Sequence, residues 1–264
     1  MPLKIRTYFD LTEPDRSGLP QQIGAQRRRV AERLAGVKRL VAVMSGKGGV
    51  GKSFVTAHLA RALGRDGRAV GVLDADLNGP TIASLLGTSG ATLTADGDAV
   101  EPVTGVDGVK CISMAYLLED GRPLAFKGPE AESFVWRGAM EAAALREFLG
   151  DIAWGPLDLL LVDLPPGIAR FSELADLLPE PPAVLTVTIP TPESRDAVRR
   201  AMRLALERGS RLLGVVENMT GGAFAGDAGE ALTREFGIPL LGQVPFHPSH
   251  TVWEGIARKI GSPA

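Results

Sequence analysis

Short apolar runs alternate along the chain with longer segments in which apolar residues recur at helical spacing. The run from Leu40 to Met44 is the first, and a helical pattern begins soon after it, at Lys52. Such alternation is typical of βαβ units, so it predicts an α/β fold with a mostly parallel central sheet of about seven to eight strands flanked by helices. We expect strands at residues 40–44, 69–74, 109–115, 157–163, 183–189, 212–216 and 239–244, helices at residues 52–63, 80–86, 132–149, 193–208 and 250–260, and a β-excursion within residues 87–108.

The segment before the first strand has a different character. Residues 1–24 are polar and contain several Pro and Gly residues, so we expect an extended or loosely docked lead-in. Residues 25–35 predict a short basic helix. Its arginines could form a partner patch, although a solvated helix face accounts for them better. These arginines are Arg27, Arg28, Arg29 and Arg33. We therefore divide the chain into an N-terminal extension, residues 1–36, and a single domain, residues 37–264.

Composition and charge narrow the classes of function. Hydrophobic residues make up 45% and charged residues 23%, which is ordinary for a soluble globular protein. The net charge of −2 gives no support for binding to nucleic acid or to an anionic membrane. We find neither a signal-peptide pattern at the N-terminus nor an apolar stretch of about 18 residues that could cross a membrane. The single cysteine, Cys111, excludes an intrachain disulfide, so we expect a cytoplasmic protein.

The turn after the first strand carries the clearest chemical signal. Gly46, Gly51, Lys52 and Ser53 fit the pattern G-x-x-x-x-G-K-[ST] between a strand and a helix, which is the phosphate loop. Glycines let successive backbone N–H groups turn inward toward phosphate oxygens, and the helix N-terminus adds partial positive charge. In this interpretation Lys52 reaches the β- and γ-phosphates, and the Ser53 hydroxyl is a ligand of Mg²⁺.

Acidic residues at the ends of two other strands complete a candidate site. Asp74 and Asp76 follow one predicted strand, and Asp163 ends a fully apolar one. In open parallel sheets, ligands bind beyond the carboxyl ends of the strands. Asp163 is placed to hold Mg²⁺ through water, Asp76 to orient or deprotonate the attacking water, and Gly167 to offer its N–H to the γ-phosphate. The alternative for these aspartates is capping of a turn or helix after each strand.

Lys47 makes the loop unusual and gives a first resemblance to a known group of proteins. With this extra lysine the sequence Gly46-Lys47-Gly48-Gly49-Val50-Gly51-Lys52 resembles the deviant phosphate loop of the MinD and ParA superfamily. Over about residues 37–260 the chain resembles the Mrp/NBP35 (ApbC-like) ATPases. The motifs that carry this resemblance are residues 37–53, residues 73–76 with Gly79-Pro80, Trp136-Arg137-Gly138, residues 163–167, residues 216–219 and residues 239–245.

This resemblance implies a three-layer P-loop NTPase fold and a homodimeric, Mg²⁺-dependent ATPase that encloses two ATP molecules. The family's usual role is to scaffold iron–sulfur clusters or to carry them to apoproteins. By the resemblance, Lys47 reaches the partner's nucleotide, Asn218 hydrogen-bonds the adenine and the Pro245 loop packs beside it. For Asn218, a strand-end turn residue is the alternative. The expected catalytic residues are then Lys47, Lys52 and Asp76, and the expected magnesium ligands, partly through water, are Ser53, Asp76 and Asp163. The expected nucleotide-binding residues are Gly46, Lys47, Gly48, Gly49, Val50, Gly51, Lys52, Ser53, Phe54, Gly167, Asn218 and Pro245.

Several positions depart from the family pattern. Cluster-holding members present Cys-x-x-Cys after the Glu-Asn-Met segment, whereas residues 220–227 contain no cysteine here. A dimer would supply only the two Cys111 thiols, and Cys111 lies in a predicted buried strand, so an iron–sulfur cluster held in the family manner is chemically disfavoured. We interpret His247 and His250 as loop residues rather than metal ligands. Ile168-Ala169-Arg170 stands where the family has Thr-Gly-Asp, which affects the expected hydrolysis rate, and Phe54 stands where the family tends to have Thr.

Three functions remain open from the sequence. The favoured one is an Mrp-like ATPase in metallocluster or cofactor assembly, acting with an unknown client or scaffold protein that supplies cysteines. The second is a ParA/MinD-like positioning switch, for which residues 252–260 are only a weak candidate membrane helix. The third, an ATP-dependent ligase or kinase, has no substrate motif. We expect no nucleic-acid partner and no stable membrane association.

Overall fold

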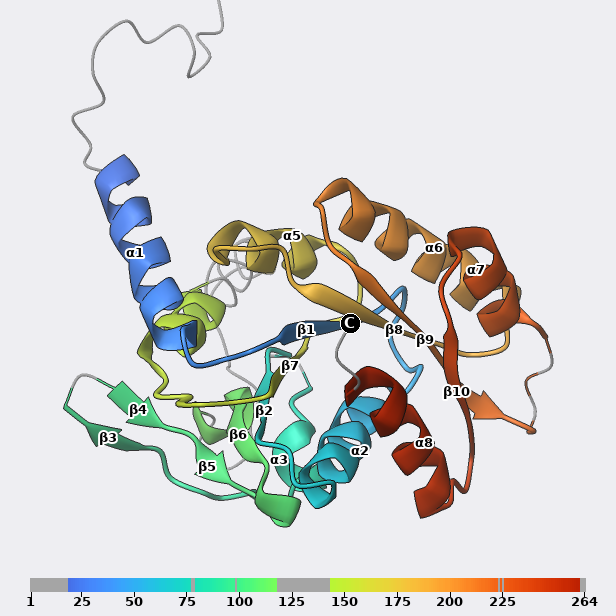
Figure 1. Cartoon of the computed structure of the whole chain (residues 1–264), viewed down its shortest axis with the longest axis horizontal. Coiled ribbons are helices and arrows are strands. Elements are labelled where there is room, and N and C mark those ends of the chain that lie inside the picture. The colour runs from blue at the N-terminus through green and yellow to red at the C-terminus, as the bar shows by residue number, and fades with distance from the viewer. Residues whose placement is uncertain are drawn as a thin grey trace, which may run out of the picture.

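The computed structural model describes residues 19–76, 79–97, 99–117, 143–222, 224 and 226–261. Within this part of the chain, eight strands form one sheet in the order β10-β9-β8-β1-β7-β2-β6-β5. All neighbouring strands are parallel except β5 and β6. Helices cover both faces of the sheet (Figure 1). The predicted three-layer α/β fold is therefore confirmed.

The element bounds agree closely with the sequence pattern. The strands of the large sheet are β1 (Leu40–Ser45), β2 (Val70–Asp74), β5 (Val103–Thr104), β6 (Lys110–Ser113), β7 (Leu159–Asp163), β8 (Ala183–Thr188), β9 (Leu212–Thr220) and β10 (Leu240–Pro245). A separate antiparallel pair, β3 (Thr94–Asp96) and β4 (Ala99–Glu101), confirms the expected β-excursion. The helices are α1 (Leu19–Leu34), α2 (Lys52–Arg65), α3 (Ile82–Leu85), α5 (Ala169–Leu177), α6 (Pro192–Glu207), α7 (Ala228–Phe236) and α8 (His250–Gly261), and residues 143–151 are also helical.

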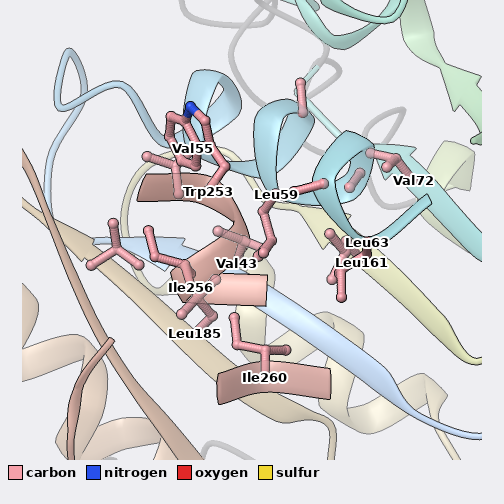
Figure 2. Packing of buried hydrophobic residues seen from close by; sticks show 14 of the residues in the cluster. Val43, Val55, Leu59, Leu63, Val72, Leu161, Leu185, Trp253, Ile256 and Ile260 are labelled. Carbon is pink, nitrogen blue, oxygen red and sulfur yellow. The ribbon is translucent and has the colours of Figure 1, made fainter. Parts of the chain in front are cut away.

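The sheet separates two hydrophobic cores because successive side chains of a strand point to opposite faces. Val41 and Val43 of β1 pack in the core beneath α2 and α8, whereas Ala42 and Met44 pack in the core beneath α6 and α7. Figure 2 shows the first core from close by: Trp253 and Ile256 of α8 lie with α2 side chains over the strands. The strands are apolar throughout because both of their faces are buried.

Four expectations need correction or fall outside the described residues. Helices α5 and α7 have no counterpart among the predicted elements. Helix α1 begins at Leu19 rather than at residue 25, so residues 19–24 are helical and not extended. Strand β9 continues four residues beyond the predicted end at Val216, to Thr220. The first part of the helix predicted at residues 132–149, with Trp136-Arg137-Gly138, lies outside the described residues.

Helix α1 projects from the body and is attached at its C-terminal half (Figure 1). Val30 and Leu34 are buried against the core. Arg29 donates to the carbonyl of Gly150 at 3.1 Å and pairs with Asp151 at 3.0 Å, while Arg33 donates to the same carbonyl at 3.4 Å. These two arginines therefore attach α1 to the end of helix 143–151. For them, neither the predicted solvated helix face nor the alternative of a partner-binding patch is correct. Arg27 and Arg28 are exposed.

Candidate functional site

The phosphate loop connects β1 to α2 at the carboxyl edge of the sheet, as the sequence predicts. Gly51 is the residue just before α2 and has a left-handed backbone, with φ 78° and ψ 28°. A Cβ atom at this position would lie 2.3 Å from the Nδ2 atom of Asn218. At Gly46, a Cβ atom would lie 2.2 Å from the backbone of Ala197 in α6. Glycine is thus required at Gly51 by conformation and contact, and at Gly46 by the close approach of a helix.

A cavity of about 510 Å³ opens beside the loop, a size typical of small-molecule sites. Phe54, Asp76 and most of the phosphate loop line it, and the N-terminal end of α2 faces it. Five predicted site residues are not among the residues that line it: Gly46, Asp163, Gly167, Asn218 and Pro245. Its lining consists of Ser45, Lys47, Gly48, Gly49, Val50, Gly51, Lys52, Ser53, Phe54, Asp76, Gly79, Thr81, Ser84, Leu85 and Pro166.

Asp163 is the centre of a buried polar cluster at the base of the loop. Its carboxylate is fully buried at the end of β7. The Lys52 Nζ atom lies 2.6 Å from Oδ1, and the Ser53 hydroxyl donates to Oδ2 at 2.6 Å. Thr56, one turn further along α2, donates to Oδ1 at 2.9 Å. The sequence identified Lys52, Ser53 and Asp163 and missed Thr56, whose position four residues after Lys52 places it on the same helix face.

Lys52 is almost fully buried, with 6% of its side chain exposed. It meets the distance of an ion pair with Asp163, yet its ammonium group has no well-angled hydrogen bond among the described residues. An ammonium carries three N–H donors. A buried cation with unused donors at the N-terminal end of a helix is suited to an anionic ligand that brings many oxygen acceptors.

Asp74 joins three elements rather than facing the cavity. It is fully buried, and its carboxylate accepts the Ser113 hydroxyl at 2.9 Å, the Ile82 N–H at 3.1 Å and the Asp76 N–H at 3.3 Å. Burial raises its pKa to about 7, and the nearby Asp163 adds to the rise. Asp74 accepts from the N–H of Ile82, the first residue of α3, so its role is the structural one of capping a helix. Asp76, in contrast, lines the cavity. Ser113 is a member of this network that sequence reasoning missed.

Three other predicted residues do not line the cavity. The Gly167 N–H donates to the Ser45 carbonyl at 3.3 Å. Asn218 is buried, and its Nδ2 atom donates to the Val50 carbonyl at 2.9 Å. Pro245 ends β10 opposite Thr220 of β9. The predicted contacts of these residues with phosphate and adenine stay predictions.

Residues 220–227, where the family pattern places cysteines, present an aromatic side chain instead. Phe224 stacks on Phe246 with ring centroids 6.4 Å apart, and both rings are partly exposed. Cys111 is fully buried in β6, as expected, and burial raises the pKa of its thiol to about 11. Among the residues that the structure describes, no group of three or more His, Cys, Asp or Glu could hold a metal ion.

Phe54 belongs to an aromatic cluster between α2 and α8. Its ring centroid lies 4.3 Å from that of His58 and 5.7 Å from that of Trp253. Burial and the neighbouring Arg61, Arg65 and His250 lower the pKa of His58. His250 lies 3.1 Å from Arg65 through its Nδ1 atom, so its ring contacts a cation rather than a group of metal ligands. The cluster places the Phe54 ring at one wall of the cavity.

The sequence of the chain also matches proteins of known family. The family model of the NUBPL iron-transfer P-loop NTPases, in the ParA group, matches residues 36–257. The chain belongs to this family. It is 39% identical over 241 residues to an iron–sulfur cluster carrier protein of Saccharolobus solfataricus, covering 87% of the chain and 78% of that protein. It is 38% identical over 251 residues to the human cytosolic Fe-S cluster assembly factor NUBP2, covering 88% of the chain and 89% of that protein.

Solved structures agree with this assignment. A nucleotide-binding protein of Archaeoglobus fulgidus in complex with ADP superimposes with a TM-score of 0.69 and 31% identity, covering 90% of this chain and 94% of that one. The cell division ATPase MinD of Pyrococcus furiosus superimposes with a TM-score of 0.60 at 22% identity, covering 84% of this chain and 98% of that one, and shares the fold. The chain is therefore a P-loop NTPase of the ParA group in both sequence and fold.

The contact between Gly51 and Asn218 gives a testable expectation for the stability of this NTPase. Gly51→Ala should lower the free energy of unfolding by more than Gly67→Ala, a control whose φ of 79° is the same but whose Cβ would contact nothing within 4 Å. The control should cost about 1–2 kcal/mol for its left-handed backbone. Gly51→Ala should cost at least about 1 kcal/mol more, because the new methyl group displaces Asn218 from its carbonyl. Urea unfolding of both variants without nucleotide measures this, and equal losses would contradict the account.

Proposed function

We propose that this protein is a Mg²⁺-dependent ATPase whose ATP-bound homodimer assists iron–sulfur cluster assembly with a partner protein that supplies the thiolates. One observation carries the ATPase part: Lys52, Ser53 and Asp163 meet at the base of a glycine loop beside a cavity of about 510 Å³. The iron–sulfur part rests on the relatives, two of which are named as a cluster carrier and a cluster assembly factor.

The residues present fit a nucleoside triphosphate. The left-handed Gly51 turns the loop around the N-terminal end of α2, where helix amides and the helix dipole favour an anion. Lys52 lies with unused donors at this point. When a triphosphate enters, Lys52 exchanges the Asp163 carboxylate for phosphate oxygens, which supply the acceptors that the described residues leave missing.

The residues present also fit Mg²⁺. This ion prefers oxygen ligands and keeps several of its waters. The Ser53 hydroxyl and the Asp163 carboxylate both offer oxygen atoms as ligands, and these atoms lie 2.6 Å apart. Ser53 would bind the ion directly, and Asp163 would hold its waters. Bound there, Mg²⁺ supplies neutralisation of the charge that develops on the phosphates. If Lys52 turned to the phosphates, a Mg²⁺ ion held by Ser53 and Asp163 would replace the lysine as the cation beside the Asp163 carboxylate.

Asp76 is the residue we assign to the attacking water. It lines the cavity, and its N–H donates to the buried Asp74 at 3.3 Å, which fixes the backbone at the end of β2. A carboxylate held at the cavity wall can orient a water for in-line attack. Lys47 also lines the cavity, and by the family resemblance it reaches the nucleotide of the second subunit in the dimer.

The chain itself has few residues that could be ligands of an iron–sulfur cluster. Its one cysteine is fully buried, and the raised pKa keeps the thiol protonated. An iron–sulfur cluster needs about four thiolates or histidines, whereas two subunits bring two buried thiols. We therefore place the cluster ligands on a partner protein, with ATP binding and hydrolysis by this chain controlling how that partner is held.

The positioning-switch alternative loses its candidate membrane helix. In α8 the apolar side chains Trp253, Ile256 and Ile260 are 3%, 1% and 2% exposed and pack on α2 and the sheet (Figure 2). A helix whose apolar face is already buried has none left for a lipid surface. Within the described residues, no helix is long and apolar enough to cross a membrane.

Anaerobic reconstitution tests the cluster assignment. The wild type, the Cys111→Ala variant and an Asp76→Ala variant locked with Mg-ATP are incubated with iron and sulfide, alone and with the protein that co-purifies with Asp76→Ala. We expect cluster absorption only with the partner, at equal intensity for Cys111→Ala, and dependent on ATP. A stable cluster on the chain alone that disappears in Cys111→Ala would overturn the proposal, and so would a partner-bound cluster that is indifferent to ATP.

A further inference from the structure

Asn218 is buried behind the phosphate loop and touches it directly. It lies in β9, one residue before a bulge in the pairing of β9 with β10, and is 4% exposed. In that bulge Met219 takes a left-handed backbone, with φ 58°, and bulges commonly re-aim the side chains beside them. The Asn218 side chain points to the α2 face of the sheet and donates to the Val50 carbonyl at 2.9 Å. Since a carbonyl only accepts, the amide nitrogen must be the atom that faces it.

This hydrogen bond sets the orientation of one peptide group of the loop. The Val50–Gly51 peptide is trans, so its C=O and its N–H point in opposite directions. Asn218 does not line the cavity, whereas Val50 and Gly51 do. Holding the Val50 carbonyl toward Asn218 therefore turns the Gly51 N–H toward the cavity, where phosphate oxygens are to be bound.

We propose that Asn218 is a positioning residue for phosphate binding: it aims the Gly51 amide at the phosphates through the Val50 carbonyl, whatever base the nucleotide carries. The inference rests on the proposed nucleotide-binding function and goes beyond the contact with adenine that the family resemblance implies. With the amide nitrogen occupied by Val50, the Asn218 oxygen and the second N–H remain for a base. The same side chain could then hydrogen-bond the base and hold the conformation of the phosphate loop at the same time.

Removal of the amide has a defined consequence. Val50 is 1% exposed, so its carbonyl would be left buried without a partner, or the peptide would rotate and direct the oxygen into the cavity. Either change weakens the site, the second by placing the negative end of a carbonyl dipole against phosphate. Binding of the triphosphate chain alone must therefore suffer, not only binding of the adenine.

The test uses inorganic triphosphate, which has phosphates and no base. Direct calorimetric titrations with Mg²⁺ compare ATP and inorganic triphosphate on the full chain, for the wild type, Asn218→Ala and the nearly isosteric Asn218→Leu. Thr186→Val is the matched control, because it removes another buried side-chain bond in the same sheet, from Thr186 to the Gly214 carbonyl at 3.2 Å. Circular dichroism confirms that each variant is folded at the temperature of titration.

We expect both Asn218 variants to lose about tenfold in affinity for inorganic triphosphate and at least as much in affinity for ATP. The control should bind both ligands like the wild type. An Asn218 variant that loses ATP but binds inorganic triphosphate like the wild type would overturn the inference, because Asn218 would then read only the base. Unchanged binding of both ligands, or an equal loss in Thr186→Val, would also overturn it. A wild type that binds neither ligand would instead contradict the proposed function.

Discussion

Lys52→Ala is expected to abolish ATP turnover and to destabilise the nucleotide-free protein. The rate should fall at least about a thousandfold, because the cation beside the phosphates is lost. The free energy of unfolding should fall by about 3 kcal/mol, because Asp163 remains fully buried without its counter-ion. Steady-state hydrolysis assays and urea unfolding measure the two effects.

A double-mutant cycle separates the ion pair from the phosphate contact. Asp163→Asn combined with Lys52→Ala should be less destabilised than the sum of the two single variants, since neither buried charge then remains unpaired. Lys38→Ala is the control, because Lys38 pairs with Asp158 at 2.7 Å with 77% of its side chain exposed, and surface pairs contribute about 0–1 kcal/mol. Wild-type turnover in Lys52→Ala would contradict the assignment of the phosphate loop.

Lys47→Ala is expected to keep ATP binding and to lose hydrolysis. Both lysines line the cavity, but Lys47 is partly exposed, whereas the Lys52 side chain is almost fully buried against Asp163. If Lys47 stabilises charge on the partner subunit's nucleotide, its loss should lower the maximal rate by about a hundredfold to a thousandfold, with the dissociation constant of ATP for the monomer unchanged. Calorimetry and hydrolysis assays over a range of protein concentrations give both quantities.

Mixed dimers provide the sharper form of this test. An equal mixture of Lys47→Ala and Asp76→Ala should regain hydrolysis, up to about half of one active site per dimer on average. If Lys47 acts across the interface, each mixed dimer has one complete site, formed by Asp76 of one subunit and Lys47 of the other. Lys38→Ala, at the opposite edge of the sheet, should hydrolyse ATP like the wild type. Full activity of Lys47→Ala, or no recovery in the mixed dimer, would show that the cross-subunit role is wrong.

The fold was largely predictable because its signals are local. Apolar runs marked the seven predicted strands, each of which has a counterpart in the sheet, and the glycine loop marked the turn between β1 and α2. Helices α5 and α7 were not predicted. In α5, Ala169–Leu177, only Phe171 and Leu174 are buried, so few apolar residues mark the helix face. Helix α7 begins after a segment rich in Gly and Ala, which masks its start.

The site was predictable where one motif contained the chemistry, and not where it depends on distant elements. Lys52, Ser53 and Asp163 follow from strand ends and a loop. The bond from Ser113 to Asp74 joins residues 39 positions apart, and that from Asn218 to Val50 joins residues 168 positions apart. No spacing rule connects them. The first bond depends on β2 and β6 being neighbours in the sheet, and the second depends on the bulge at Met219 beside Asn218.

The mass of the ATP-bound particle tests the central claim most directly, namely that Mg-ATP at this loop makes a dimer. Sedimentation equilibrium is measured for the wild type with Mg²⁺, with and without a non-hydrolysable ATP analogue, and for Lys52→Ala. We expect a particle of twice the 27.8 kDa chain mass with the analogue, carrying two nucleotides, and no such shift in Lys52→Ala. A particle whose mass does not respond to the analogue would contradict the account.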